Sequence, residues 1–214
     1  MKKFIFKLNE FEKEKIFISI YSKIDVIKIW LEIIRHVLIS PLQNKGDLII
    51  IKHKMQRVFL KKNNQIVSLN FPFTIRINKD DINKVYIKVY IDEIEIDNKM
   101  ISDILEIIGC KEFESMCSID FIEPILYKEE CNENFWAVLK KLLMLDDGYI
   151  RYDYDEEHFN SQYPYMHPVN HYDIFYSNSA TFKLGFEKKL ELEKFIDMLD
   201  ITTDQFFVKE INEK

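Results

Sequence analysis

The chain has 214 residues, of which 47% are hydrophobic and 14% aromatic, and its formal net charge at pH 7 is −6. This composition predicts a globular protein with a sizeable core and excludes an intrinsically disordered chain. No apolar run approaches the ~20 residues that a membrane helix needs. Charged residues at Lys7, Glu10 and Glu12 also interrupt the N-terminal apolar stretch before a signal-peptide core forms. We therefore expect a cytoplasmic protein with no membrane contact.

The first forty residues are predicted to form the helical N-terminal part of the protein (residues 1–40). Residues 1–20 fit a helix or a strand, whereas apolar residues between Lys23 and Ile39 recur at helical spacing. Ser22 is the expected N-cap of this helix, and Asp25 stands at the capping-box position.

Residues 47–96 change to a period of two, which predicts a sheet. Alternation of polar and apolar residues after Phe73 and after Lys84 indicates one solvated face and antiparallel pairing. Residues 41–90 hold ten Lys or Arg against three Asp or Glu, a net of +7, whereas residues 91–160 hold six against nineteen, a net of −13. The basic strands of residues 41–90 thus offer a face for nucleic acid or a protein partner, or only lysines that solvate exposed strands.

Helices are predicted again over residues 98–146 and, at the C-terminal end, over residues 187–200. Apolar residues recur at helical spacing in both ranges, and Gly109 ends the first of these helices. Cys110, Cys117 and Cys131 are spaced too irregularly for a zinc site or a disulfide framework and are expected to be free thiols. Since no linker or repeat divides the chain, the sequence predicts a single α+β domain, with a mostly antiparallel sheet flanked by helices.

The segment of residues 148–186 has a composition that core packing does not explain. It holds three of the five histidines and seven of the eleven tyrosines. Residues 149–155 alternate as a strand would, which places Arg151, Asp153 and Asp155 on one face. A loop over residues 156–166 follows, and loops between rigid elements often carry function.

The spacing around His171 predicts a second polar strand. His171 and Asp173 are two residues apart and share a strand face. A turn of three residues at positions 177–179 pairs Asp173 with Lys183 and keeps polar and apolar residues on separate faces, which a turn of two residues would mix. We therefore expect His171, Asp173 and Lys183 to project together.

These residue types fit two chemistries. Histidines with carboxylates are ligands of divalent transition metals, so a metal cofactor stays open. Paired histidines with an orienting aspartate and a cation also fit metal-free phosphodiester cleavage. The structural alternative is a hydrogen-bonded knot of imidazole and phenol groups, with solvated charges on an edge strand. The candidate catalytic residues are His158, His167, His171, Asp153, Asp173, Arg151 and Lys183.

A resemblance supports attention to this segment. The pattern Tyr-Ile-Arg151-Tyr-Asp153-Tyr-Asp-x2-His158, then His167-Pro-x2-His171-x-Asp173 and Thr181-Phe-Lys183-x-Gly185, resembles the C-terminal signature of an uncharacterised bacterial family of restriction and phage-defence gene neighbourhoods. More distantly, it is similar to TumE-type toxins of toxin–antitoxin pairs. The resemblance covers about forty residues and implies a defence or toxin setting, without implying a reaction.

Two classes of function follow from the sequence. The first is a nucleic-acid-cleaving, phosphodiesterase-type effector that uses the His/Asp/Arg/Lys cluster, with the basic strands guiding the polyanion. The second is a non-catalytic accessory subunit that binds a nuclease or ATPase partner in a defence complex. The acidic net charge favours the subunit, because nucleic-acid binders usually have a basic surface. The gathering of His, Asp, Arg and Lys favours the effector. A protein partner or a homo-oligomer is expected in either class.

Overall fold

The computed structural model describes residues 2–79, 85–110, 122–164, 166–174 and 183–204. The helices are α1 (Glu10–Ile16), α2 (Lys23–Ile39), α3 (Asn98–Ile108), α5 (Ile122–Cys131), α6 (Phe135–Met144) and α7 (Leu192–Met198). The strands are β1 (Lys2–Phe6), β2 (Leu48–Lys52), β3 (Gln56–Lys62), β4 (Gln65–Asn70), β5 (Thr74–Lys79), β6 (Val85–Ile91), β7 (Ile94–Glu95), β8 (Ile150–Tyr154), β9 (Asn170–Asp173) and β10 (Lys183–Phe186).

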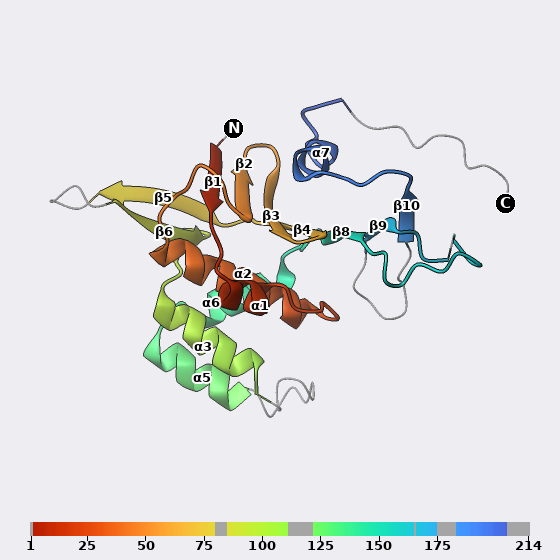
Figure 1. Ribbon diagram of the computed structural model, residues 1–214. Helices are drawn as coiled ribbons and strands as arrows, with labels where there is room; N and C mark the ends of the chain where they lie inside the picture. The colour runs from red at the N-terminus through yellow and green to blue at the C-terminus, as the bar shows by residue number, and fades with distance from the viewer. Residues whose placement is uncertain (1, 80–84, 111–121, 165, 175–182, 205–214) are drawn as a thin grey trace.

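The strands form a seven-stranded sheet in the order β1-β2-β3-β4-β8-β9-β10 and a three-stranded sheet in the order β5-β6-β7. Every strand pair is antiparallel. Helices flank the large sheet, as Figure 1 shows. This arrangement confirms the predicted α+β class, with a mostly antiparallel sheet flanked by helices in one domain. Among the described residues, no helix has the length and apolar character that crossing a membrane requires.

The prediction of a helical N-terminal part is wrong for the first residues, which form β1 at the edge of the large sheet. Phe4 and Phe6 alternate with exposed or half-buried neighbours and pair with Ile50 and Leu48 of β2. In a strand both phenylalanine side chains point to the same face and are buried there. In a helix they would be more than half a turn apart and would point in different directions. The helix predicted next is confirmed as α2, with the capping box of Ser22 and Asp25.

The predicted sheet of residues 47–96 is divided between the two sheets. After Asn70 the chain leaves the large sheet, and the buried rings of Phe71 and Phe73 pack edge to face with centroids 4.8 Å apart. The free edge of β4 is taken by β8, which is 80 residues further along the chain, through pairs such as Val67 with Arg151. Antiparallel pairing inside each sheet is as predicted.

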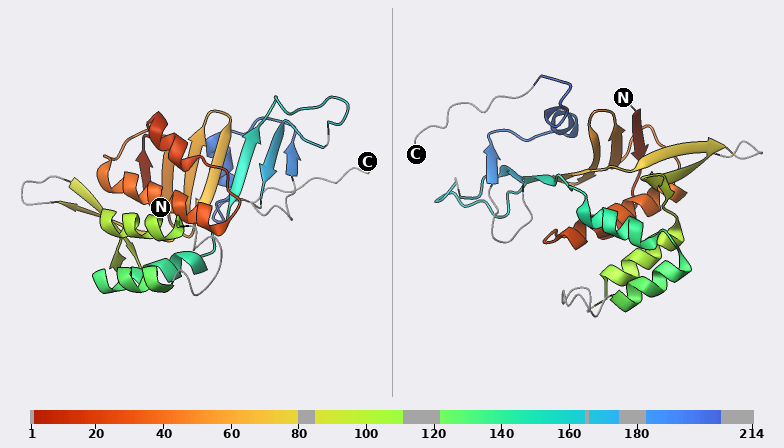
Figure 2. Two further views of the ribbon diagram at one scale, coloured as in Figure 1. Left: turned by 90° about the horizontal axis from the view of Figure 1, so that it is seen from below. Right: turned by 180° about the vertical axis from the view of Figure 1, so that it is seen from behind.

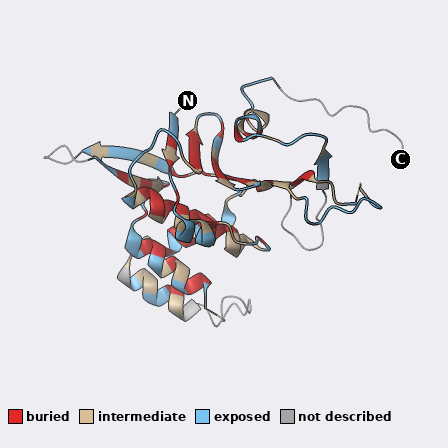
Figure 3. Cartoon of the chain, viewed as in Figure 1, coloured by how far each residue is buried: buried red, intermediate tan, exposed pale blue. Residues whose placement is uncertain are grey.

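Buried apolar residues cover both faces of the large sheet. One face packs against α2, whose buried residues include Val26, Trp30 and Ile34. The other face packs against α7, where Phe195 meets Phe59 edge to face at 6.0 Å. Figure 3 shows that buried residues gather in α2 and the central strands, while β10 and the segment after β8 are largely exposed.

The C-terminal helix is shorter than the predicted range of residues 187–200. Residues 187–191 are not helical, because the backbone N–H of Leu190 donates to the Tyr152 hydroxyl at 2.8 Å instead of entering a helix. The helical range 98–146 contains α3, α5 and α6, and its residues 111–121 lie outside the described residues, together with Cys117. Cys110 has a free thiol.

The end of the large sheet formed by β8, β9 and β10 extends past the helices α1 and α2. Figure 2 shows these strands beside the helical layer instead of beneath it. The face of β8 that carries Tyr152 turns toward α7, so the face that carries Arg151 and Asp153 turns the other way, toward the side of α1 and α2. The polar half of this sheet end is therefore open for a site.

Lys52, the last residue of β2, is a half-buried cation whose charge depends on pH. Its ammonium donates to the Gln56 side chain at 2.8 Å and to the Phe71 carbonyl at 3.0 Å. Burial lowers the pKa of Lys52 to about 8, against about 10.4 in an unfolded chain.

We predict that this lysine makes the protein more stable as the pH rises from 8 to 10. In that window the unfolded chain keeps the Lys52 proton and the folded chain loses it, so the free energy of unfolding increases with pH. Because the side chain is partly exposed, we expect about 1 kcal/mol rather than the full shift. The measurement is urea unfolding of the wild type and of Lys52→Met at each pH. If the difference between the two proteins stays constant over this window, the account of Lys52 is wrong.

Candidate functional site

The entry of the chain into β8 is fixed at Gly148. Its φ of +50° lies in the left-handed region that favours glycine, and a Cβ there would come within 2.7 Å of the Asn70 side chain. The guanidinium of Arg57 donates to the Gly148 carbonyl and, at 2.8 Å, to the Asn70 side chain. The backbone N–H of Asn70 donates to the Asp147 backbone carbonyl at 2.7 Å. These contacts set the direction in which β8 leaves.

The register of β8, β9 and β10 brings the polar residues together. Arg151 of β8 lies opposite Asp173 of β9, and Asp153 lies opposite His171. On the other side of β9, Lys183 of β10 lies opposite Asp173, which confirms the register predicted from the turn length. Cross-strand neighbours on one face are close enough to interact directly. The pairing of Phe175 with Thr181 lies outside the described residues.

Arg151 joins the two aspartates across the strands. Its Nε donates to Asp153 at 2.8 Å, and its Nη2 donates to Asp173. The second oxygen of Asp153 accepts from the Gln65 side chain at 2.9 Å. Burial disfavours the guanidinium charge, but attraction to Tyr149 and the two aspartates outweighs it and raises the pKa of Arg151. The arginine is therefore a permanent cation, and Arg151, Asp153, Asp173 and His171 are called the inner group below.

His171 completes the inner group from a buried position, with 1% of its side chain exposed. Its Nδ1–H donates to the Pro168 carbonyl at 2.7 Å, which directs Nε2 toward Asp153 at 3.7 Å and Asp173 at 4.0 Å. Gly185 makes this possible, because a Cβ there would lie 2.8 Å from the Pro168 ring. In this arrangement the imidazole orients its neighbours and does not reach solvent.

Asp155, His158 and His167 form a second, more exposed cluster, called the outer group below. Asp155 extends the β8–β9 ladder, since its N–H donates to the Val169 carbonyl at 2.8 Å. Its carboxylate accepts from His158 Nδ1 at 2.9 Å and from His167 Nε2 at 3.0 Å. His158 is 72% exposed and His167 28%.

The two groups touch through their histidines. The His167 ring meets the His171 ring edge to face at 4.7 Å, and His158 lies 5.8 Å from His167. Burial opposes ionisation of Asp155, but hydrogen bonds from the His158 backbone and from both imidazoles outweigh it and lower the pKa of the carboxyl. Each group also holds three side chains of metal-binding type whose ligand atoms lie within 4.8 Å of one another, namely Asp155, His158 and His167, and Asp153, His171 and Asp173.

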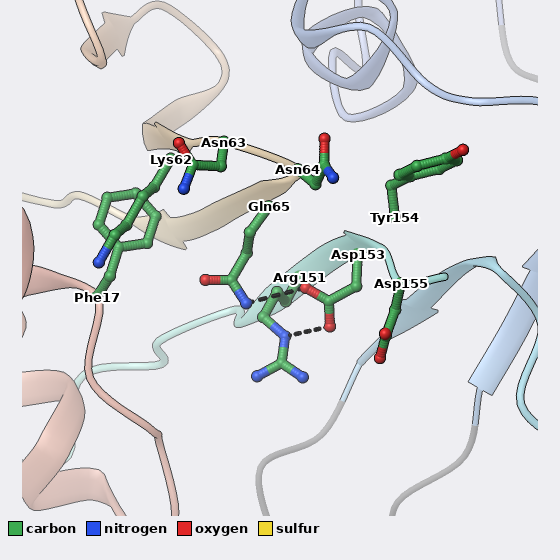
Figure 4. Close-up of a pocket in the computed structure, with 9 residues that line it drawn as sticks. All are labelled: Phe17, Lys62, Asn63, Asn64, Gln65, Arg151, Asp153, Tyr154 and Asp155. Carbon is green, nitrogen blue, oxygen red and sulfur yellow. Dashed lines mark hydrogen bonds and ion pairs between the residues drawn. The ribbon is translucent and has the colours of Figure 1, made fainter. Parts of the chain in front are cut away.

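A recess of about 430 Å³ lies beside both groups, between the end of α1, the β3–β4 turn and β8. Figure 4 shows Gln65, Arg151 and Asp153 joined by hydrogen bonds, with Phe17 and Lys62 together at one end. The volume falls within the ~300–1,000 Å³ typical of ligand sites. The residues that line the recess are Phe17, Lys62, Asn63, Asn64, Gln65, Arg151, Asp153, Tyr154 and Asp155.

Six of the seven candidate residues predicted from sequence have described side chains, and these six lie together in the two groups. Lys183 takes its backbone place opposite Asp173, and its side chain lies outside the described part of the structure. The alternation of residues 149–155 placed Asp155 on the face of Arg151 and Asp153, but we did not predict it as a site residue. The three-residue spacing from Asp155 to His158 could have indicated their contact, because the His158 N–H donates to the Asp155 side chain at 3.2 Å. Phe17 and Lys62 could not be predicted as lining residues from local spacing, because long-range packing brings them to the recess.

The basic strands of residues 41–90 separate in the structure. Arg57 is turned inward, while Arg76 and Lys88 of the small sheet pair with Glu93 and Glu95. Among the described residues of this range, Lys62 is the cation that lines the recess. The described basic residues of this range therefore do not form one continuous face beside the recess.

No family model, curated protein or solved structure matches this chain. The chemistry assigned to the two groups therefore rests on their residues, distances and burial.

We predict that Arg151→Met lowers the free energy of unfolding by about 2–4 kcal/mol, because it leaves two largely buried carboxylates without their cation. Asp153 is only 13% exposed and Asp173 only 14%. Urea unfolding at pH 7 measures the change.

Arg35→Met is the matched control for this variant. The Arg35 side chain is as exposed as that of Arg151, at 30% against 28%, and it pairs with Glu32 one helical turn away. Such a local pair contributes about 0.5 kcal/mol. Equal losses in the two variants would show that the bridge between β8 and β9 has no special role.

Proposed function

We propose that this protein cleaves phosphodiester bonds of nucleic acid at the outer group. The observation that carries the proposal is the pair of imidazoles on one carboxylate, His158 and His167 on Asp155, at the edge of a recess that also presents Arg151. A histidine pair of this kind supplies a base and an acid near neutral pH. The aspartate between them fixes which ring nitrogen carries the proton.

The proposed reaction is a displacement at phosphorus. One imidazole takes a proton from the attacking hydroxyl or water, whose oxygen then bonds to phosphorus. The bond from phosphorus to the leaving oxygen breaks, its electron pair stays on that oxygen, and the second imidazole supplies the proton. A cation beside the phosphoryl oxygens stabilises the charge that develops on them. Arg151 and Lys62 both line the recess, with Lys62 at the end beside Phe17, as Figure 4 shows.

The inner group has a supporting part in this proposal. His171 is buried and its Nδ1 is committed to a backbone carbonyl, so it orients His167 and the aspartates and does not contact the substrate. This assigns the proton transfers to His158 and His167. The resemblance of residues 148–186 to a defence-associated family supports a setting in which such cleavage acts on foreign or host nucleic acid.

A second candidate function is the accessory subunit of a defence complex, which binds a nuclease or ATPase partner. One observation favours it: the polar side chains of the inner group are paired with one another or with the backbone, which suits a structural cluster without a catalytic role. Large apolar side chains are also exposed on α5 and α6, among them Tyr127, Trp136 and Met144. In this reading the outer group adds no chemistry.

We predict that His158→Ala and His167→Ala each lower the rate of cleavage about 100-fold or more, the contribution of a general acid or base. The measurement uses purified protein with fluorophore-quencher oligonucleotides of single- and double-stranded RNA and DNA. His53→Ala is the control, since His53 is an exposed histidine in the turn between β2 and β3. Cleavage by both site variants at the wild-type rate would exclude the proposed chemistry, and no cleavage of any substrate by the wild type would favour the accessory subunit.

A further inference from the structure

The outer group holds a set of side chains of the types that bind divalent metal ions. We propose that Asp155, His158 and His167 bind one divalent transition-metal ion of the zinc type. Their ligand atoms lie within 4.8 Å of one another, and one oxygen of Asp155 is within 3.0 Å of a nitrogen on each imidazole. Two imidazoles and a carboxylate are a common ligand set for zinc and similar ions.

Small movements are enough to admit the ion. Ligands that stand about 2.0–2.2 Å from a tetrahedral metal lie about 3.4 Å from one another. The present separations of 2.9 and 3.0 Å from the Asp155 oxygen to the two ring nitrogens are close to that value. The ion would replace the two N–H···O hydrogen bonds, and each neutral imidazole would carry its proton on the other nitrogen. Because metal binding requires neutral imidazoles, zinc binding is weaker at acid pH.

Two of the three ligand residues, Asp155 and His167, are held in position by neighbouring groups. Asp155 is held by its backbone bond to Val169 at 2.8 Å. The His167 ring lies edge-on against the buried ring of His171 at 4.7 Å. Ligands that are oriented by their neighbours bind metal more tightly than free side chains do. His158, on the exposed loop, has the most freedom to adjust.

The inner group is the competing site, and its own cation excludes it. Asp153, His171 and Asp173 also converge within 4.8 Å. However, the Arg151 guanidinium binds both of these carboxylates, and His171 is almost fully buried. A metal there would need the arginine to leave a largely buried position, whereas the outer group faces solvent.

The carboxylate of Asp155 also favours a cation at the outer group, because it brings a negative charge to the ligand set. Three protein ligands leave at least one coordination position open, as in catalytic zinc sites. This use of the ion rests on the proposed function and changes the part that the histidines play in it. As metal ligands, His158 and His167 would no longer transfer protons, and the ion would supply positive charge and lower the pKa of a bound water toward about 7.

Titration calorimetry with ZnCl₂ on metal-stripped full-length protein tests the inference. We expect one ion per chain, and we expect Asp155→Asn, His158→Ala and His167→Ala each to weaken binding at least tenfold. His158→Ala is the most informative variant, because the side chain is largely exposed and its loss does not endanger folding. Glu157→Gln is the control: it removes an exposed charge next to His158 and leaves the outer group intact.

The inference is overturned if the wild type binds no zinc, if His158→Ala binds as tightly as the wild type, or if Glu157→Gln weakens binding as much as the site variants do. Cleavage assays with EDTA and after zinc is restored separate this inference from the proposed function. Zinc binding without cleavage of any oligonucleotide supports the metal site and removes the proposed function. Cleavage that persists in EDTA, by a protein that binds no zinc, removes the metal site and keeps the imidazole route.

Discussion

The bridge from Arg151 to Asp153 and Asp173 is the interaction on which the rest of the site depends. It joins β8 to β9 by a planar cation whose hydrogen bonds require both aspartates on the same face and in one register. A shift of one residue between these strands would move the arginine to the face that packs against α7, where an unpaired charge is costly. The ion pairs therefore define the geometry of this sheet end more than they add to its stability.

From this constraint follows the division of the polar residues into two groups. The inner group is closed, with its charges paired and the His171 ring held by the Pro168 carbonyl. The outer group stands one step further along the same strands, at Asp155, where pairing to Val169 ends and the loop begins. There His158 is largely exposed to solvent, and Asp155 lines the recess. In the proposed function the buried inner group orients the residues of the exposed outer group.

Local periodicity was enough to predict α2 with its capping box, the polar face of β8 and the pairing of Asp173 with Lys183. These features depend on residues close in the chain, so alternation and turn length determine them. The division into two sheets and the approach of Phe17 to the recess depend on long-range packing, which alternation does not encode. The sequence also gave His171 the same role as His158, because spacing shows which face a side chain shares but not how deeply it is buried.

A crystal structure of the protein with Zn²⁺, recorded on both sides of the zinc absorption edge, tests the central claim most directly. The account predicts one anomalous peak about 2.0–2.2 Å from ligand atoms of Asp155, His158 and His167, with Arg151 still bound to Asp153 and Asp173. A peak between Asp153, His171 and Asp173 with the arginine displaced would contradict it. So would imidazoles of His158 and His167 that point away from Asp155.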